Sequence, residues 1–275
     1  MISLALAIRP AAPSIITVLF ERHRMLATYG AIMVALAALA MAMQSIDPRV
    51  LASGAGIWVK PTKFFFSVGI FALTAAWFFG YVRPERRQSP AMRRTAILLI
   101  ATGTFELAYI CWQAAQGLES HFNVGTPFHI LMYALMGAAA LLLVGTTLPL
   151  AWEIGRRPAA GLPRSFVAAV VIGLLLTFLL GGGFGGYMSS QPGHAVGAEG
   201  GNVFLFGWNR LGGDLRIAHF LGIHAEQAIP ILAALTAGLA VRGRWLVLIV
   251  GSLAYVAITL TVFAQAVAGR ALLPV

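Results

Sequence analysis

The chain has 275 residues, of which 59% are hydrophobic and 10% are charged, and its mean hydropathy is +0.85. Soluble domains carry about 25% charged residues, so this composition excludes a soluble protein and indicates a polytopic membrane protein. The net charge of +10 does not indicate nucleic-acid binding, because the arginines cluster in loops between apolar segments. The single cysteine, Cys111, excludes an intramolecular disulfide and a cysteine-based zinc or iron–sulfur site.

The first 25 residues differ from the rest of the chain. They contain a short apolar run that is interrupted by an arginine and two prolines, and they end in the charged cluster Glu21 to Arg24. A basic start and a small-residue cleavage site are both missing, so we do not expect a cleaved signal peptide. We predict a short interfacial segment over residues 1–25 and a single transmembrane bundle over residues 26–275.

Seven apolar segments each approach the roughly 20 residues that a helix needs to cross a bilayer. They cover residues 26–45, 63–82, 95–117, 127–151, 165–187, 216–241 and 245–267. We therefore predict an all-α fold, a bundle of seven transmembrane helices.

The basic residues are unevenly distributed over the loops between these segments. The loops after the second, fourth and sixth segments carry five, three and two arginines, whereas the loop between the third and fourth segments carries none. Because positively charged loops stay in the cytoplasm, this pattern predicts a cytoplasmic N-terminus and a C-terminus outside. The glycine-rich loop 188–215 is then outside as well.

The stretch from Gly213 to Pro230 combines an apolar helical pattern with polar side chains. Its polar members are Asp214, Arg216, His219, His224, Glu226 and Gln227. A charge at the bilayer centre costs roughly 2.5–3.5 kcal/mol on insertion scales, and on a helical wheel these side chains fall within about half the circumference. We therefore expect them to face the bundle interior, with Pro230 as the position of a helix kink.

Two carboxyl groups are expected near the middle of the membrane. At 1.5 Å per residue, Glu106 lies roughly 18 Å from the cytoplasmic end of its segment and Glu226 roughly 15 Å from the outer end of its own. We expect the two carboxyls to face each other, or a shared water, at the bottom of a polar well that opens outward. Two charged carboxylates in a low-dielectric interior would repel each other, so at least one should be protonated.

The histidines permit several interpretations. His129 and His219 lie at similar depth, about one turn inside the outer surface, as two axial haem ligands require. His121, His219 and His224 with a carboxylate would suit zinc or iron, although His219 and His224 lie about 140° apart on a regular helix. Hydrogen-bonded packing groups and a proton relay without a cofactor remain open alternatives.

The glycines of GGGFGG at 181–186 do not form a phosphate-binding loop, because no GK[ST] follows them. They end an apolar segment, where close helix packing or a hinge explains them better.

These residues support functional hypotheses from different classes. The first is a metal- or haem-dependent redox enzyme, whose candidate catalytic residues are Glu106 and Glu226 as proton carriers, Arg216 as the holder of an anionic group, and Asp214. The second is a proton-coupled transporter that uses the two carboxyls, and the third is a non-catalytic membrane subunit. The expected partners are the lipid bilayer and a small-molecule or lipid substrate from the outer side. A transporter needs a polar path through the cytoplasmic half, where the sequence offers few polar residues.

Three segments carry a resemblance to a known family. They are WVKPTKFFFS (58–67), QAAQGLESHFN (113–123) and GGDLRIAHFLGIHAEQAIP (212–230). They resemble the signature segments of a family of bacterial polytopic membrane proteins, which implies a location in the bacterial inner membrane and implies no substrate. The inverted seven-segment topology is also similar to that of the zinc hydrolases of the ceramidase and progestin-receptor type. Those proteins pair histidines four residues apart, whereas this chain has HxxxxH, so their zinc ligands are not transferred here.

Overall fold

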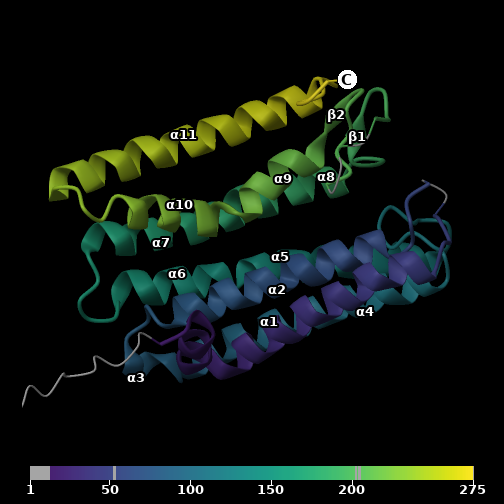
Figure 1. The fold of residues 1–275 in the computed structure, drawn as a ribbon. Coiled ribbons are helices and arrows are strands. Elements are labelled where there is room, and N and C mark those ends of the chain that lie inside the picture. Colours follow the sequence, from purple (N-terminus) through teal and green to yellow (C-terminus); the bar gives the residue numbers. More distant parts are fainter. Residues whose placement is uncertain (1–12, 52–53, 202, 204–205, 275) are drawn as a thin grey trace, which may run out of the picture.

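The computed structural model describes residues 13–51, 54–201, 203 and 206–274. Long helices lie side by side in a bundle, and all-α is confirmed as the fold class (Figure 1). Among the described residues, the strands are the two-residue segments β1 (Ala195–Val196) and β2 (Gly213–Asp214), which pair antiparallel in the loop that precedes α9.

Figure 1 labels the α-helices and strands in chain order. The helical elements are α1 (Ile15–Ile46), α2 (Val59–Phe79), α3 (Pro84–Arg87), α4 (Pro90–Ala115), α5 (Pro127–Gly145), α6 (Thr147–Arg156), α7 (Arg164–Leu176), the π-helical η1 (Thr177–Gly182), α8 (Gly183–Ser189), α9 (Leu215–Ile223), α10 (Ala225–Leu235) and α11 (Val241–Val267). Six helical stretches of the described chain are long and apolar enough to cross a membrane, or up to seven if the bent pair α9–α10 is one span.

The N-terminal helix contains a kink at His23. Residues 1–12 lie outside the described residues, and the helix begins at Ile15. His23 has non-helical φ and ψ angles of −158° and 88°, and its Nδ1 accepts a hydrogen bond from the backbone N–H of Leu26 at 3.2 Å. The turns before His23 therefore form a short helix that runs across the end of the bundle and continues into the long part of α1 (Figure 1).

The largest hydrophobic core lies between α1, α2, α4, α6 and α7. It contains Leu26, Phe79, Leu99 and Ile154, each at most 1% exposed. Glycine brings α1 and α2 together, because a Cβ at Gly30 would lie 2.7 Å from the side chain of Leu73.

The arginines of three loops lie at one end of this bundle, on the left in Figure 1, which we call the arginine-rich end. Val82 and Pro158 form a β-bridge between two of these loops there. Glu153 makes ion pairs with Arg86 at 2.9 Å and with Arg157 at 3.3 Å. The described parts of the loops after α1, α4 and α8 lie at the far end (Figure 1).

Three of the predicted spans are built from more than one helical element. The fourth comprises α5 and α6, and the fifth comprises α7, η1 and α8. The sixth is broken into α9 and α10 and ends at Leu235 rather than near residue 241. Thr236 ends α10 by donating from Oγ1 to the carbonyl of Ala233 at 3.0 Å. Hydropathy continues smoothly through such breaks, so an apolar run does not reveal them.

Candidate functional site

A group of polar side chains lies at the far end, where α2 begins and α4 ends. Lys60 is near enough to Glu106, Glu119 and Arg216 to interact with their charges. Lys63, one turn further along α2, donates from Nζ to the carbonyl of Phe206 at 2.8 Å. The first turns of α2 therefore supply two cations to this group, Lys60 and Lys63. Neither is among the site residues predicted from the sequence.

Two buried acceptors on α4 face this region without a described partner. Glu106 is 3% exposed and Gln113 is 0% exposed, and the Oε1 atom of each lacks a hydrogen bond from the described residues. The Nε2 of Gln113 does have a partner, since it donates to the hydroxyl of Tyr109 at 2.7 Å. An unpaired buried polar atom costs roughly 1–3 kcal/mol, so both oxygens are suited to accept from a water or a ligand.

His121 lies in the loop after α4 and is neutral. Its Nδ1 is 3.2 Å from the Ser120 hydroxyl, and its ring centre is 5.6 Å from that of Phe64. Burial, together with the positive charge of Lys60, lowers the pKa of His121 to about 3. This imidazole therefore does not take up a proton in the physiological pH range.

Asp214 and Arg216 form an ion pair at the start of α9. The Asp214 carboxylate caps α9 by accepting from the Arg216 backbone N–H at 3.0 Å, and it accepts from Arg216 Nη2 at 2.6 Å. The backbone N–H of Asn209 donates to it at 2.8 Å. Burial acts to raise the pKa of Asp214, but the hydrogen bonds and charge of Arg216 outweigh it and hold that pKa below its usual value. Arg216 and Asp214, which the sequence predicts as an anion holder and a catalytic residue, form a partly buried ion pair with each other here.

Asp214→Ala should lower the free energy of unfolding by about 3 kcal/mol, because it leaves a partly buried arginine without its counter-ion and α9 without its cap. Asp214→Asn should lose less, since the amide oxygen still caps the helix. The folded-state pKa is lowered, so the charge contributes stability above the unfolded pKa near 4, and this contribution disappears as the pH falls through the folded value. Thermal unfolding in detergent at pH 7 and at pH 3 measures both effects. Equal melting temperatures for all three proteins at pH 7 would contradict this assignment.

The histidines expected to bind haem or metal have separate partners. His129 Nδ1 lies 2.8 Å from the Thr126 hydroxyl at the start of α5, whereas His219 Nδ1 lies 2.9 Å from the carbonyl oxygen of Gly181 in η1. Within the described ranges, no three His, Cys, Asp or Glu side chains are arranged to hold a metal ion. A metal site of His121, His219 and His224 therefore has no support in this geometry.

The sixth span is broken at His224. The axes of α9 and α10 meet at 52° there, six residues before Pro230, so the proline is not where the helix bends. The hydroxyl of Thr177 bonds to backbone groups on both sides of the break. It accepts from the Glu226 backbone N–H at 2.9 Å and donates to the Ile223 carbonyl at 3.4 Å. The Tyr255 hydroxyl donates to the carbonyl of Leu221. Backbone groups that the break frees are thus satisfied by η1 and α11, as the membrane interior requires.

The break lies directly against the π-helical turns of η1. A Cβ at Gly222 would lie 2.6 Å from the backbone nitrogen of Gly181, and a Cβ at Gly181 would lie 2.8 Å from the side chain of Ile223. About two turns before Gly181, a Cβ at Gly173 would lie 2.9 Å from the Ala225 carbonyl oxygen. The close-packing interpretation of the glycine run is confirmed for Gly181, and two irregular helices meet backbone to backbone.

Glu226 is the deepest carboxyl of this region. It lies eleven residues after the start of α9 and nine before the end of α10, so roughly 16 Å and 14 Å from the two ends of the span. Its side chain is buried and accepts from Gln227 Nε2 at 2.9 Å. The same Nε2 also donates to the Thr74 hydroxyl at 3.0 Å, and Gln227 Oε1 accepts a hydrogen bond from His224 Nδ1 at 3.2 Å. A chain of polar groups therefore runs from His224 through Gln227 to Glu226.

A small cavity lies between Glu226 and the arginine-rich end. Its volume is about 10 Å³, which is close to the room that one water needs. Glu226 lines it together with the threonines Thr95, Thr146 and Thr147 and with apolar side chains. Each threonine hydroxyl donates to a backbone carbonyl three or four residues before it, so its oxygen keeps lone pairs that can accept a hydrogen bond. The sequence offers few polar residues in this half of the bundle, and three of them line the cavity beside Glu226.

The two mid-membrane carboxyls do not face each other. A Cβ at Gly103 would lie 3.0 Å from the side chain of Val68, which sets α4 against α2. Glu106 is three residues from Gly103 towards the far end. Thr74 marks the level of Glu226, because Gln227 donates a hydrogen bond to both, and it is six residues from Val68 towards the arginine-rich end. At 1.5 Å per residue these levels differ by roughly 13 Å. The sequence placed both near mid-membrane but did not determine how α4 and α10 are aligned.

The comparisons with known proteins add no relative. No protein-family description, no curated protein and no solved structure matches the chain.

Proposed function

We propose that this protein is a transporter that conducts protons across the membrane down their gradient, with Glu226 as the group that carries the proton. The observation that carries the proposal is the break at His224, which lies inside a span, against a second irregular helix, with a buried carboxyl two residues beyond it.

Discontinuous helices near the bilayer midplane form the ion and substrate sites of many secondary transporters. Non-helical backbone at membrane depth is tolerated only where protein or a water-filled cavity satisfies it, so maintaining such a break suggests a function. An ionisable side chain inside the membrane is likewise functional by default. Glu226 combines both features, since its own backbone N–H is held across the break by Thr177.

Polar groups on both sides of Glu226 support a path. Towards the far end, His224 and Gln227 connect to it, and Glu106 and Gln113 provide acceptors without described partners. Towards the arginine-rich end, the small cavity with its three threonines adjoins the carboxyl. Motion of α10 against α9 about the break would expose Glu226 alternately to the two sides, which is how a hinge gives alternating access.

The proposal is tested with purified protein in liposomes that contain a pH-sensitive dye. We expect an imposed pH gradient, with the membrane potential clamped by potassium and valinomycin, to drive internal acidification faster than in protein-free liposomes. Orientation of the protein does not affect this result, because a reconstituted population has both orientations. Rates equal to those of protein-free liposomes for gradients of both signs would overturn the proposal.

A haem-dependent membrane enzyme is the second candidate, and one observation favours it. The Nδ1 of His219 bonds to the Gly181 carbonyl, which is the arrangement that orients a ligating imidazole and leaves Nε2 available. His129 has a corresponding bond from Nδ1 to Thr126, but no described contact brings it to His219. A Soret band in the purified protein that His219→Ala abolishes would favour this candidate.

A further inference from the structure

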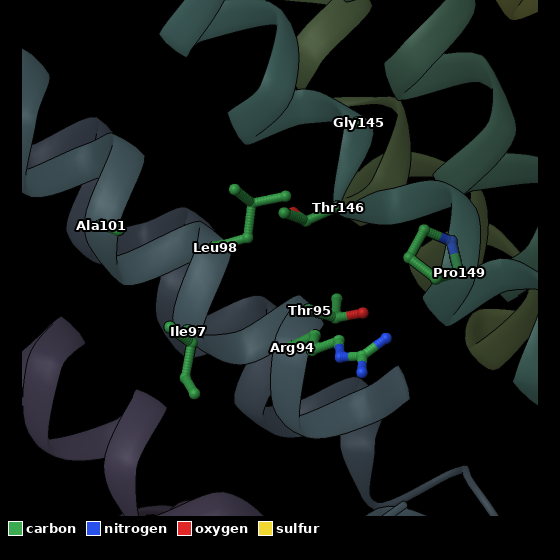
Figure 2. Close-up of a pocket in the computed structure, with 8 residues that line it drawn as sticks. All are labelled: Arg94, Thr95, Ile97, Leu98, Ala101, Gly145, Thr146 and Pro149. Atoms are coloured by element: carbon green, nitrogen blue, oxygen red, sulfur yellow. The ribbon is translucent and has the colours of Figure 1, made fainter. Parts of the chain in front are cut away.

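A groove on the outer surface of the bundle lies apart from the residues that surround Glu226. It runs between α4 and the junction of α5 with α6, and its volume is about 410 Å³ (Figure 2). Its lining residues are Arg94, Thr95, Ile97, Leu98, Ala101, Gly145, Thr146 and Pro149. Leu98 and Thr146 approach each other across it in Figure 2, and Arg94 lies at the same end as Pro149.

The groove is apolar along its length and cationic at one end. Thr95 and Thr146 donate their hydroxyl protons to the backbone carbonyls of Ala91 and Leu143, so neither donates into the groove. Arg94 makes no hydrogen bond or ion pair with the described residues, whereas its neighbours Arg86 and Arg157 share Glu153. From Arg94 to Ala101 the groove follows seven residues of α4, roughly 10 Å. Its shape therefore matches an alkyl chain that lies beneath an anionic group.

The level of Arg94 is that of the lipid headgroups. It is the fifth residue of α4, at the arginine-rich end. On α6, three residues beyond the lining residue Pro149, Trp152 is 61% exposed, and the guanidinium carbon of Arg156 lies 4.1 Å from the centre of its ring. Exposed tryptophan and arginine beside each other are typical of the membrane–water interface, and basic pockets between helices on that side bind anionic headgroups.

We propose that this groove binds one anionic phospholipid, with its phosphate on Arg94 and an acyl chain between Leu98 and Thr146. The arginines of the surrounding loops favour an anionic over a zwitterionic headgroup. A soluble phosphate would leave the apolar length of the groove unfilled. A second copy of the chain would have to offer Arg94 an acid, and of the three acids at this end, Glu21, Glu85 and Glu153, the last already holds two arginines.

Native mass spectrometry of the protein in neutral detergent tests this site. We expect phosphatidylglycerol to be retained as one molecule per chain, at concentrations where phosphatidylcholine with the same acyl chains and inorganic phosphate are not. Arg94→Gln should weaken retention of phosphatidylglycerol about fivefold, the effect of one cation near an anionic headgroup. Ala101→Phe, at an exposed position inside the groove, should reduce retention while leaving the melting temperature unchanged.

The matched control is Arg93→Gln, because Arg93 is the adjacent arginine, is exposed and does not line the groove. It should leave retention unchanged. Equal losses in Arg93→Gln and Arg94→Gln would reduce the effect to non-specific charge and overturn the site. Retention that neither Arg94→Gln nor Ala101→Phe alters, inorganic phosphate bound as tightly as the lipid, or a dimer that excludes lipid would overturn it as well.

Discussion

Replacing Glu226 with glutamine should abolish proton movement in liposomes while the protein remains folded. The amide has the same shape, and its oxygen can still accept the hydrogen bond that Gln227 Nε2 donates to the carboxyl at 2.9 Å. It cannot, however, gain and release a proton, so the path is interrupted at its deepest point. We expect a rate of acidification equal to that of protein-free liposomes and a melting temperature close to that of the wild type.

The control for this variant is Glu85→Gln, which removes an exposed carboxyl in α3 at the arginine-rich end. It should retain the wild-type rate. Glu106→Gln tests the second buried carboxyl, and a partial loss is expected because Glu106 lies at a different level and does not share the Gln227 network. Wild-type flux in Glu226→Gln would demote this carboxyl to a structural hydrogen-bond acceptor and leave the proposed path without its carrier.

Gly222→Leu should prevent the bundle from forming its native contact between α9 and η1. A Cβ at this position would lie 2.6 Å from the Gly181 nitrogen and 2.7 Å from the carbonyl carbon of Leu180. Both are backbone atoms, which cannot rotate away as a side chain can. Ordinary overpacking costs about 1–3 kcal/mol, and leucine adds three more carbons to a contact that is already closed at Cβ. We expect aggregation or loss of the monodisperse peak on size-exclusion chromatography, with Gly222→Ala folded but less stable.

Gly137→Leu is the matched control, because a Cβ at Gly137 in α5 would meet no atom within 4 Å. Its chromatographic profile should be that of the wild type, and its stability should stay within about 0.5 kcal/mol, as for surface positions without special features. If Gly222→Leu behaved like Gly137→Leu, the backbone contact between α9 and η1 would be wrong, and with it the support for the break.

The sequence by itself determined the class of protein and most of its helices. Long apolar segments and clustered loop arginines predict membrane helices, because a chain in lipid must satisfy its backbone within the helix. The polar stretch around His224 and the glycine run at 181–186 were also recognisable, since side-chain type alone distinguishes them from the surrounding apolar residues. A helical wheel correctly indicated that Glu226 is turned away from lipid.

Tertiary structure alone decided which polar groups meet. Helical periodicity records the direction of a side chain around its own axis, but it carries no information on the axial alignment of two helices. For that reason the wheel could not separate Glu106 from Glu226, or foresee that Asp214 neutralises Arg216. The break at His224 is likewise a tertiary property. Its freed backbone groups are stable only because Thr177 of η1 and Tyr255 of α11 reach them, and these partners lie 46 and 34 residues away from their acceptors in the chain.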